Sequence, residues 1–211
     1  MANHVYFSVS VEANKEAHDA LEDAWLTETY KRKHWADDSE IEVKELLCYS
    51  KLPFFDKVEK TFDEDGHLEN SYNWYCDNIG AKWCSMEEWE GSCFSGYSAW
   101  RAPYELCSAI VEFLYKYDNE ANLKMTYEDE FRNFIGVCEF YCDDDGDACD
   151  DDNYIDSEEL NEVVAERFDC DIDGDFEWFE EYKNIHGVLE VPQEYLDEVV
   201  YNFFDTGSLY D

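Results

Sequence analysis

Basic residues are scarce in this sequence. Its 211 residues include 15 Lys and Arg against 54 Asp and Glu, which gives a formal net charge of −39. A surplus of this size repels the phosphates of nucleic acids and of anionic membranes, so the composition excludes direct binding to either. The same charge destabilises the compact state by self-repulsion. We therefore expect cations, salt or a basic partner to offset it.

Targeting and metal-binding signals are also missing. No apolar run reaches transmembrane length, and the N-terminus MANHVYFSVSVEA lacks the basic and long apolar regions of a secretory signal. We therefore expect a cytoplasmic protein whose nine cysteines are free thiols in a reducing compartment. No CxxC and no Cys/His set with zinc-finger spacing occurs. Most cysteines are then expected in the core, with a disulfide framework as the alternative.

Catalytic motifs are equally scarce. The chain contains no GxSxG, P-loop, GxGxxG or HExxH pattern. Its five histidines are scattered, with no Ser or Cys nucleophile motif around them. Because carboxylates occur throughout, their pairing does not single out a glycosidase dyad. We expect no enzymatic activity.

Apolar and aromatic residues, in contrast, are abundant at 45% and 18%. They distinguish this chain from a disordered acidic tail. Alternation predicts a half-buried strand over residues 2–11 and helical spacing predicts helices. The expected helices are 14–30, a short one near 54–62, 71–79 and 103–117; the further strands are 81–89, 92–99, 122–128 and 134–142. This order predicts an α+β fold, an antiparallel sheet with helices on one face.

The composition changes near residue 143. Residues 139–181 contain twenty acids and a single base, Arg167. Helical spacing continues within this part of the chain and predicts helices over 157–168 and 192–204. We therefore divide the chain into an α+β domain, residues 1–142, and an acidic helical appendage, residues 143–211.

An unusual cluster of aromatic residues lies between residues 73 and 103, which read NWYCDNIGAKW, an acidic stretch, then SAWRAP. This cluster resembles the signature of the YubB-like family of plasmid and phage proteins, and Gly136, Val137 and Glu139 fit that family's closing strand. The resemblance covers about residues 1–142. The matching positions are Trp74, Tyr75, Asn78, Gly80, Lys82, Trp83, Ala99, Trp100 and Pro103, whereas Ile79 and Ala81 stand where the family usually has Trp and Thr.

The resemblance implies a ferredoxin-like domain and a phage or mobile-element protein, and it implies no catalytic residues. We expect Trp74, Trp83 and Trp100 to pack on the sheet beneath the helices, with a ligand pocket as the alternative. Gly80 is expected to end a helix with a positive φ.

Residues 169–180, DCDIDGDFEWFE, match the pattern D-x-D-x-D-G-x5-E of an EF-hand calcium loop. Calcium prefers carboxylate and carbonyl oxygens, and Gly174 would make the sharp turn at the sixth position. No clear partner loop exists, and a chance match in an Asp-rich tract is the alternative. The candidate ligands are Asp169, Asp171, Asp173, Asp175 through its carbonyl, and Glu180.

Our leading functional hypothesis is charge mimicry of a nucleic acid, directed at a basic nucleic-acid-binding host protein. The alternatives are a calcium-binding module centred on residues 169–180 and an acidic proteome in which the charge reflects the environment. The candidate partner-binding residues are Asp143, Asp144, Asp145, Asp147, Asp150, Asp151, Asp152, Glu158, Glu162 and Glu166.

Calcium binding can be tested by titration calorimetry. We expect heat of binding in the wild type and a sharply weakened affinity in Glu180→Gln, because the substitution removes an oxygen of the bidentate ligand. A folded protein that gives no heat at millimolar calcium would reject the hypothesis.

Overall fold

The computed structural model describes residues 3–25, 28–33, 40–45, 52–64, 68–167 and 193–208. The strands are β1 (His4–Glu12), β2 (Glu28–Lys33), β3 (Glu40–Glu45), β4 (Cys84–Glu90), β5 (Cys93–Ala99), β6 (Asn122–Asp129), β7 (Phe134–Cys142) and β8 (Ala148–Asp156). The helices are α1 (Lys15–Trp25), the 3-10 turn η2 (Pro53–Phe55), α2 (Ser71–Asn78), α3 (Tyr104–Leu114), α4 (Ser157–Arg167) and α5 (Gln193–Thr206).

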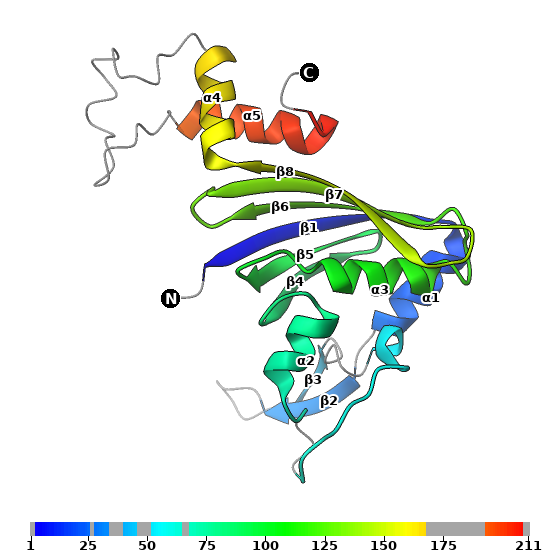
Figure 1. The fold of residues 1–211 in the computed structure, drawn as a ribbon. Helices are drawn as coiled ribbons and strands as arrows, with labels where there is room; N and C mark the ends of the chain where they lie inside the picture. The colour runs from blue at the N-terminus through cyan, green and yellow to red at the C-terminus, as the bar shows by residue number, and fades with distance from the viewer. Residues whose placement is uncertain are drawn as a thin grey trace.

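Six strands form one antiparallel sheet in the order β4-β5-β1-β6-β7-β8 (Figure 1). The elements β1, α1, β4, β5, α3 and β6 follow the β-α-β-β-α-β order of a ferredoxin-like domain. The separate β2–β3 hairpin and α2 are inserted between α1 and β4, and β7 and β8 extend the sheet beyond β6. The predicted α+β class is confirmed.

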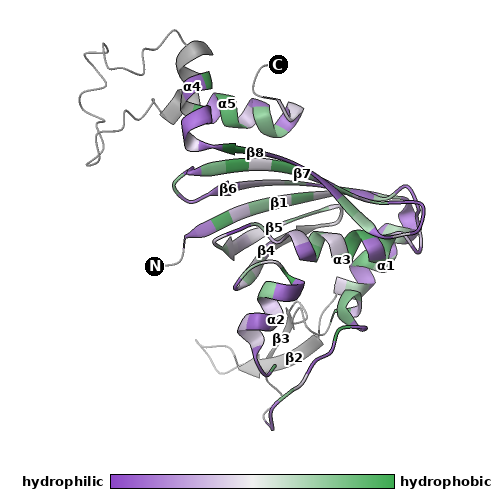
Figure 2. Cartoon of the chain, viewed as in Figure 1, coloured by the Kyte–Doolittle hydropathy of each residue, from purple (hydrophilic) through white to green (hydrophobic). Residues whose placement is uncertain are grey.

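The main core lies between the sheet and helices α1 and α3. The alternation seen in the sequence places Val5, Phe7, Val9 and Val11 of β1 in this core, with their polar neighbours on the opposite face. Helices α1 and α3 contribute the apolar stripes that their spacing predicts, and these appear as green bands in Figure 2. The core cluster includes Ala17, Leu21, Leu106, Ile110 and Leu114.

A second, smaller core lies on the opposite face of β7. Ile135 and Val137 point away from α3, because side chains alternate along a strand and Cys138 and Phe140 belong to the main core. Helices α4 and α5 cover this second core (Figure 1). Its members are Ile135, Val137, Ile155, Leu160, Val163, Val199, Val200 and Phe203. Helices α1 and α3 of the predicted α+β domain thus share one face of the sheet, as expected, and α4 and α5 of the acidic segment lie on the other.

The predicted elements differ from the structure in two regions. The helix expected over 14–30 ends at Trp25, and strand β2 begins at Glu28. Strand β3 was not predicted, and the helix expected near 54–62 is only the turn η2.

The acidic segment after residue 142 differs more. Part of the helical appendage predicted to start at residue 143 is instead strand β8, so the helical part begins at Ser157. The change of composition at residue 143 falls within the β7–β8 hairpin, and the sheet continues across it. Pairing with β7 explains the difference, because a ladder of backbone hydrogen bonds can hold a segment whose aspartates have poor intrinsic strand propensity.

The seven cysteines in the described part of the chain are free thiols. Cys84, Cys107 and Cys138 are buried, and burial raises the pKa of the Cys107 thiol. They are small, inert core residues and not reactive nucleophiles.

Three side chains join α3, β6 and β8. The hydroxyl of Tyr104 donates to that of Tyr127 at 2.6 Å, and Tyr127 donates to Asp152 Oδ1 at 2.8 Å. Burial raises the pKa of both phenols, so both remain protonated donors. The Tyr127 ring lies against Gly136, where the Cβ of any other residue would collide with it. This position on β7 therefore requires glycine.

We expect Gly136→Ala to lower the free energy of unfolding by about 1–3 kcal/mol, because the added methyl group forces the Tyr127 ring out of place. Urea unfolding followed by circular dichroism measures the change. Ser8→Ala is the control at an exposed strand position and should stay within about 0.5 kcal/mol of wild type. A Gly136→Ala protein as stable as wild type would show that the ring contact is unimportant.

Candidate functional site

Acidic side chains gather on the β7–β8 hairpin, which forms one edge of the sheet. We call this hairpin segment, residues 139–152, the acidic ribbon. No Lys, Arg or His occurs between Arg132 and Arg167, so no base lies within the ribbon. All its carboxylate residues are exposed: Glu139, Asp143, Asp144, Asp145, Asp147, Asp150, Asp151 and Asp152. The structure thus places the seven predicted aspartates on one continuous feature.

The ribbon carries charge at a density similar to that of DNA. Residues of an antiparallel strand rise about 3.4 Å each, so the consecutive Asp150, Asp151 and Asp152 carry one charge per about 3.4 Å of strand. A single DNA strand carries one phosphate per about 3.4 Å of helix axis. Asp151 also lies directly opposite Glu139 of β7. Like charges in opposed positions destabilise a sheet, so the backbone ladder holds this pair together against repulsion.

Two of the predicted partner-binding aspartates are used inside the protein. The carboxylate of Asp143 accepts the backbone N–H groups of Asp145 and Asp147, both at 3.0 Å, and so shapes the hairpin turn. Gly146 completes this turn with a φ of +84°. The carboxylate of Asp152 accepts the Tyr127 hydroxyl, and its other oxygen lies 3.0 Å from the Tyr104 hydroxyl.

The other aspartates of the ribbon face outward. Asp151 accepts only a long hydrogen bond, 3.4 Å, from the Tyr141 hydroxyl. Among the residues that the structure describes, none donates a hydrogen bond to the carboxylates of Asp144, Asp145, Asp147 and Asp150. These four carboxylates are therefore free to meet a partner.

The predicted glutamates of α4 lie beyond the end of the ribbon. Asp156 caps this helix, because its Oδ1 accepts the N–H groups of Glu158 at 2.9 Å and Glu159 at 3.0 Å. Glu158 and Glu162 are exposed, while Leu160 and Val163 hold the helix on the second core. Glu166 belongs to α4, but its side chain lies outside the described residues.

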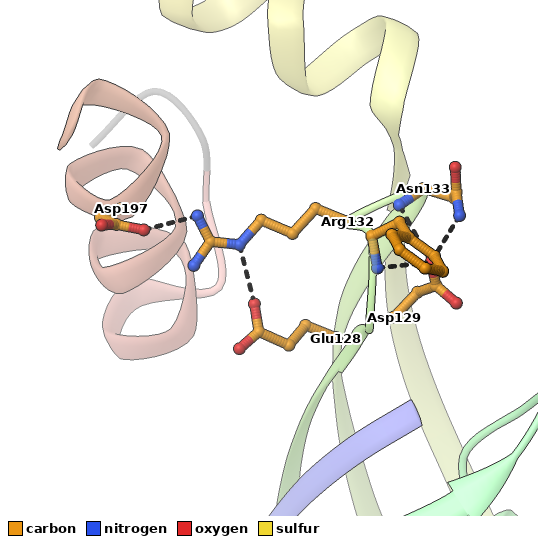
Figure 3. A network of polar contacts seen from close by, with 6 residues as sticks. Glu128, Asp129, Arg132, Asn133 and Asp197 are labelled. Atoms are coloured by element: carbon orange, nitrogen blue, oxygen red, sulfur yellow. Dashed lines mark hydrogen bonds and ion pairs between the residues drawn. The ribbon is translucent and has the colours of Figure 1, made fainter. Parts of the chain in front are cut away.

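A polar network that the sequence did not indicate fixes α5 on the sheet (Figure 3). Arg132 donates to Glu128 of β6 at 3.0 Å and to Asp197 of α5 at 2.5 Å. Asp129 is buried and accepts hydrogen bonds from Phe131 N at 3.1 Å and from the side chain of Asn133. Arg132, the base nearest in sequence to the acidic ribbon, is therefore engaged in an internal ion pair. Only its position shortly after Glu128, Asp129 and Glu130 could have suggested this.

The tryptophans of the family-like signature do not share one environment. Trp74 is buried against Phe55, as predicted. Trp83 lies instead on the opposite face of the sheet beside His4, and Trp100 is 63% exposed with a φ of +78°. The prediction that all three lie beneath the helices is wrong for these two, because strand alternation and a left-handed backbone turn direct them elsewhere. Gly80 ends α2 with a φ of +88°, as predicted.

The EF-hand-like loop lies outside the described residues. This applies to all five candidate ligands: Asp169, Asp171, Asp173, Asp175 and Glu180. Calcium binding there stays a prediction. In the ranges that the structure does describe, no group of three or more His, Cys, Asp or Glu residues is arranged to hold a metal ion.

Comparison with known proteins adds no relative: no family model, no curated protein and no solved structure matches this chain. Among the described residues, no helix combines the length and the apolar character that crossing a membrane requires.

The turn of the ribbon provides a matched pair of substitutions. We expect Asp143→Ala to lower the free energy of unfolding by about 1–3 kcal/mol, because two backbone N–H groups lose their acceptor. Asp145→Ala should be neutral or slightly stabilising, because it removes one repelling charge and no hydrogen bond. Urea unfolding compares the two variants, and equal effects would show that Asp143 does not shape the turn.

Proposed function

We propose that this chain is a non-catalytic phage or mobile-element protein that mimics the charge of a nucleic acid in the host cytoplasm. Its target would be a basic DNA- or RNA-binding host protein. The observation that carries the proposal is the acidic ribbon, where an edge strand displays carboxylates at the linear density of phosphates on one DNA strand. The resemblance of residues 1–142 to the YubB-like family supports the mobile-element origin.

Competition for the same basic side chains would be the mechanism. The target's phosphate-binding Lys and Arg would pair with the outward carboxylates of the ribbon, and Arg can do so with two parallel hydrogen bonds. The net charge of −39 would steer the two proteins together. Because the hairpin is already held in the sheet, binding would order few additional residues, which reduces its entropic cost.

An exposed edge strand also needs protection from pairing with other chains, and charged side chains give such protection. On that view the aspartates of β8 act only against aggregation. The two explanations differ in one respect. Protection requires charge on the edge but no partner, whereas mimicry requires a protein that is displaced from nucleic acid.

Displacement from DNA-cellulose provides the test. A bacterial lysate is loaded on the resin, which is then washed with the wild-type protein or with a variant at equal concentration. The ribbon variant carries Asp145→Asn, Asp147→Asn and Asp150→Asn. The control variant carries Glu16→Gln, Glu22→Gln and Asp23→Asn on the exposed side of α1, so the net charge changes equally.

We expect the wild type and the control variant to release a basic DNA-binding protein that the ribbon variant leaves on the resin. Each lost carboxylate should weaken binding about tenfold or more, because hydrogen bonds to charged groups contribute about 1.5–3 kcal/mol. Release of no protein, or equal losses in the two variants, would refute the proposal. Equal losses would mean that net charge alone matters and that the ribbon has no special role.

A further inference from the structure

A cluster of aromatic rings lies on the sheet face opposite α1 and α3. We call it the aromatic face: His4, Tyr6, Trp83 and Tyr97. The ring centroid of His4 lies 5.4 Å from that of Trp83 and 5.4 Å from that of Tyr97. Trp83 and Tyr97 are 5.8 Å apart, and Tyr6 lies 6.5 Å from Tyr97. Tyr6 remains 45% exposed, so this cluster is open to solvent.

Trp100 directly follows β5 beside this face and has an unfavourable backbone conformation. Its φ of +78° is in the left-handed region, which a bulky side chain rarely adopts. Its N–H donates to Asn3 O at 3.1 Å, so the backbone is fixed beside the start of β1. The strained conformation does not serve to bury the indole, which is 63% exposed. Outliers of this kind concentrate where a protein contacts a ligand.

The two strands that carry these rings are poor in acids, in a chain with 54 of them. Strands β1 and β5 pair in register from His4 with Ala99 to Ser10 with Cys93. The eight residues that they place on this face include no carboxylate: His4, Tyr6, Ser8, Ser10, Cys93, Ser95, Tyr97 and Ala99. The acids lie on and after the neighbouring strand β6, where Glu128 stands opposite Tyr6 and binds Arg132, and the carboxylate of Glu130 lies 3.3 Å from His4 Nδ1. The face is thus an aromatic patch bordered by carboxylates.

Charge decides which ligand suits this patch. Nucleobases stack on aromatic rings, but their phosphates would be repelled by the net charge of −39. A guanidinium group stacks equally well, is weakly hydrated and is attracted by that charge. In the described part of the chain, the cation–ring contacts are made by Lys82, Arg101 and Lys116 with other rings, so no described Lys or Arg stacks on the rings of this face.

We propose that the aromatic face binds arginine side chains of a basic protein partner, with the rings of Tyr97 and Tyr6 and the adjoining exposed ring of Trp100 as stacking surfaces. The inference rests on the proposed function for the basic character of that partner and specifies how it is recognised. The hairpin turn of the acidic ribbon lies at the other end of the sheet, because the His4 end of β1 aligns through β6 with the Phe134 end of β7. Each surface can therefore be altered without the other.

Two dye-labelled peptides serve as probes, an alternating arginine–glycine peptide and a lysine–glycine peptide of the same length. Fluorescence anisotropy at physiological ionic strength measures their affinities for the wild type. Tyr6→Ala removes a ring from the face, and Trp100→Gly removes the exposed ring that follows β5 beside it. Tyr201→Ala is the matched control, because Tyr201 is 75% exposed on α5 and outside the cluster.

We expect the wild type to bind the arginine peptide about 2- to 30-fold more tightly than the lysine peptide, the range that cation–π stacking allows. This preference should be lost in Trp100→Gly and Tyr6→Ala and kept in Tyr201→Ala. Trp100→Gly should melt no lower than wild type, because glycine relieves the left-handed conformation. The ribbon variant should weaken both peptides alike and keep the preference.

Equal affinity of the wild type for the two peptides would overturn the proposal, as would a preference that survives both ring variants. Binding of a labelled single-stranded oligonucleotide that Trp100→Gly abolishes would overturn it in favour of nucleic acid. Self-association in sedimentation experiments that Trp100→Gly abolishes would overturn it in favour of a second copy. If the protein prefers arginine but displaces nothing from DNA-cellulose, the proposed function is refuted and the arginine site stands. If it displaces a protein but shows no arginine preference, the arginine site is refuted and the proposed function stands.

Discussion

Backbone pairing between β7 and β8 holds the most acidic described segment of the chain in one extended line. The register runs without interruption from Phe134 opposite Asp156 to Cys142 opposite Ala148. Repulsion between neighbouring aspartates would favour separation of these two strands, so the ladder must be supported elsewhere. The support comes from β7, whose residues 135–138 are buried on both faces of the sheet and therefore resist movement. Every property that we assign to the acidic ribbon depends on this pairing.

Both hydrophobic cores support the β7–β8 ladder, each from one face of the sheet. The main core packs one face of the sheet on α1 and α3, while α4 and α5 cover the other face near the end of β8. Polar contacts reinforce this arrangement, since Asp152 accepts the hydroxyl of the buried Tyr127 and Arg132 joins β6 to α5. Some of the acidic residues therefore stabilise the fold, and the others are free to act on the surroundings. The total charge alone does not distinguish these two groups.

Charge and aromatic surface occupy different ends of the sheet, and the two could act together in recognition. Long-range attraction brings a basic partner close but discriminates little between basic proteins. Aromatic rings that stack on arginine provide short-range contacts of the kind that dominate protein interfaces. A target that offers both a phosphate-binding surface and exposed arginines would be selected over one that offers positive charge alone.

Sequence periodicity was sufficient for those elements that bury one regular face. Contact with the core is what produces the alternation of Val5, Phe7, Val9 and Val11 and the apolar stripes of α3 and α5, so these patterns predict it directly. The net charge follows from the composition alone. Strand β8 has no such pattern, since most of its side chains are exposed, and only the neighbouring β7 decides its conformation. The internal roles of Asp143 and Asp152 and the exposure of Trp100 were likewise decided by the tertiary structure. Each depends on backbone groups or rings that lie far along the chain or across a turn, which residue type and spacing do not encode.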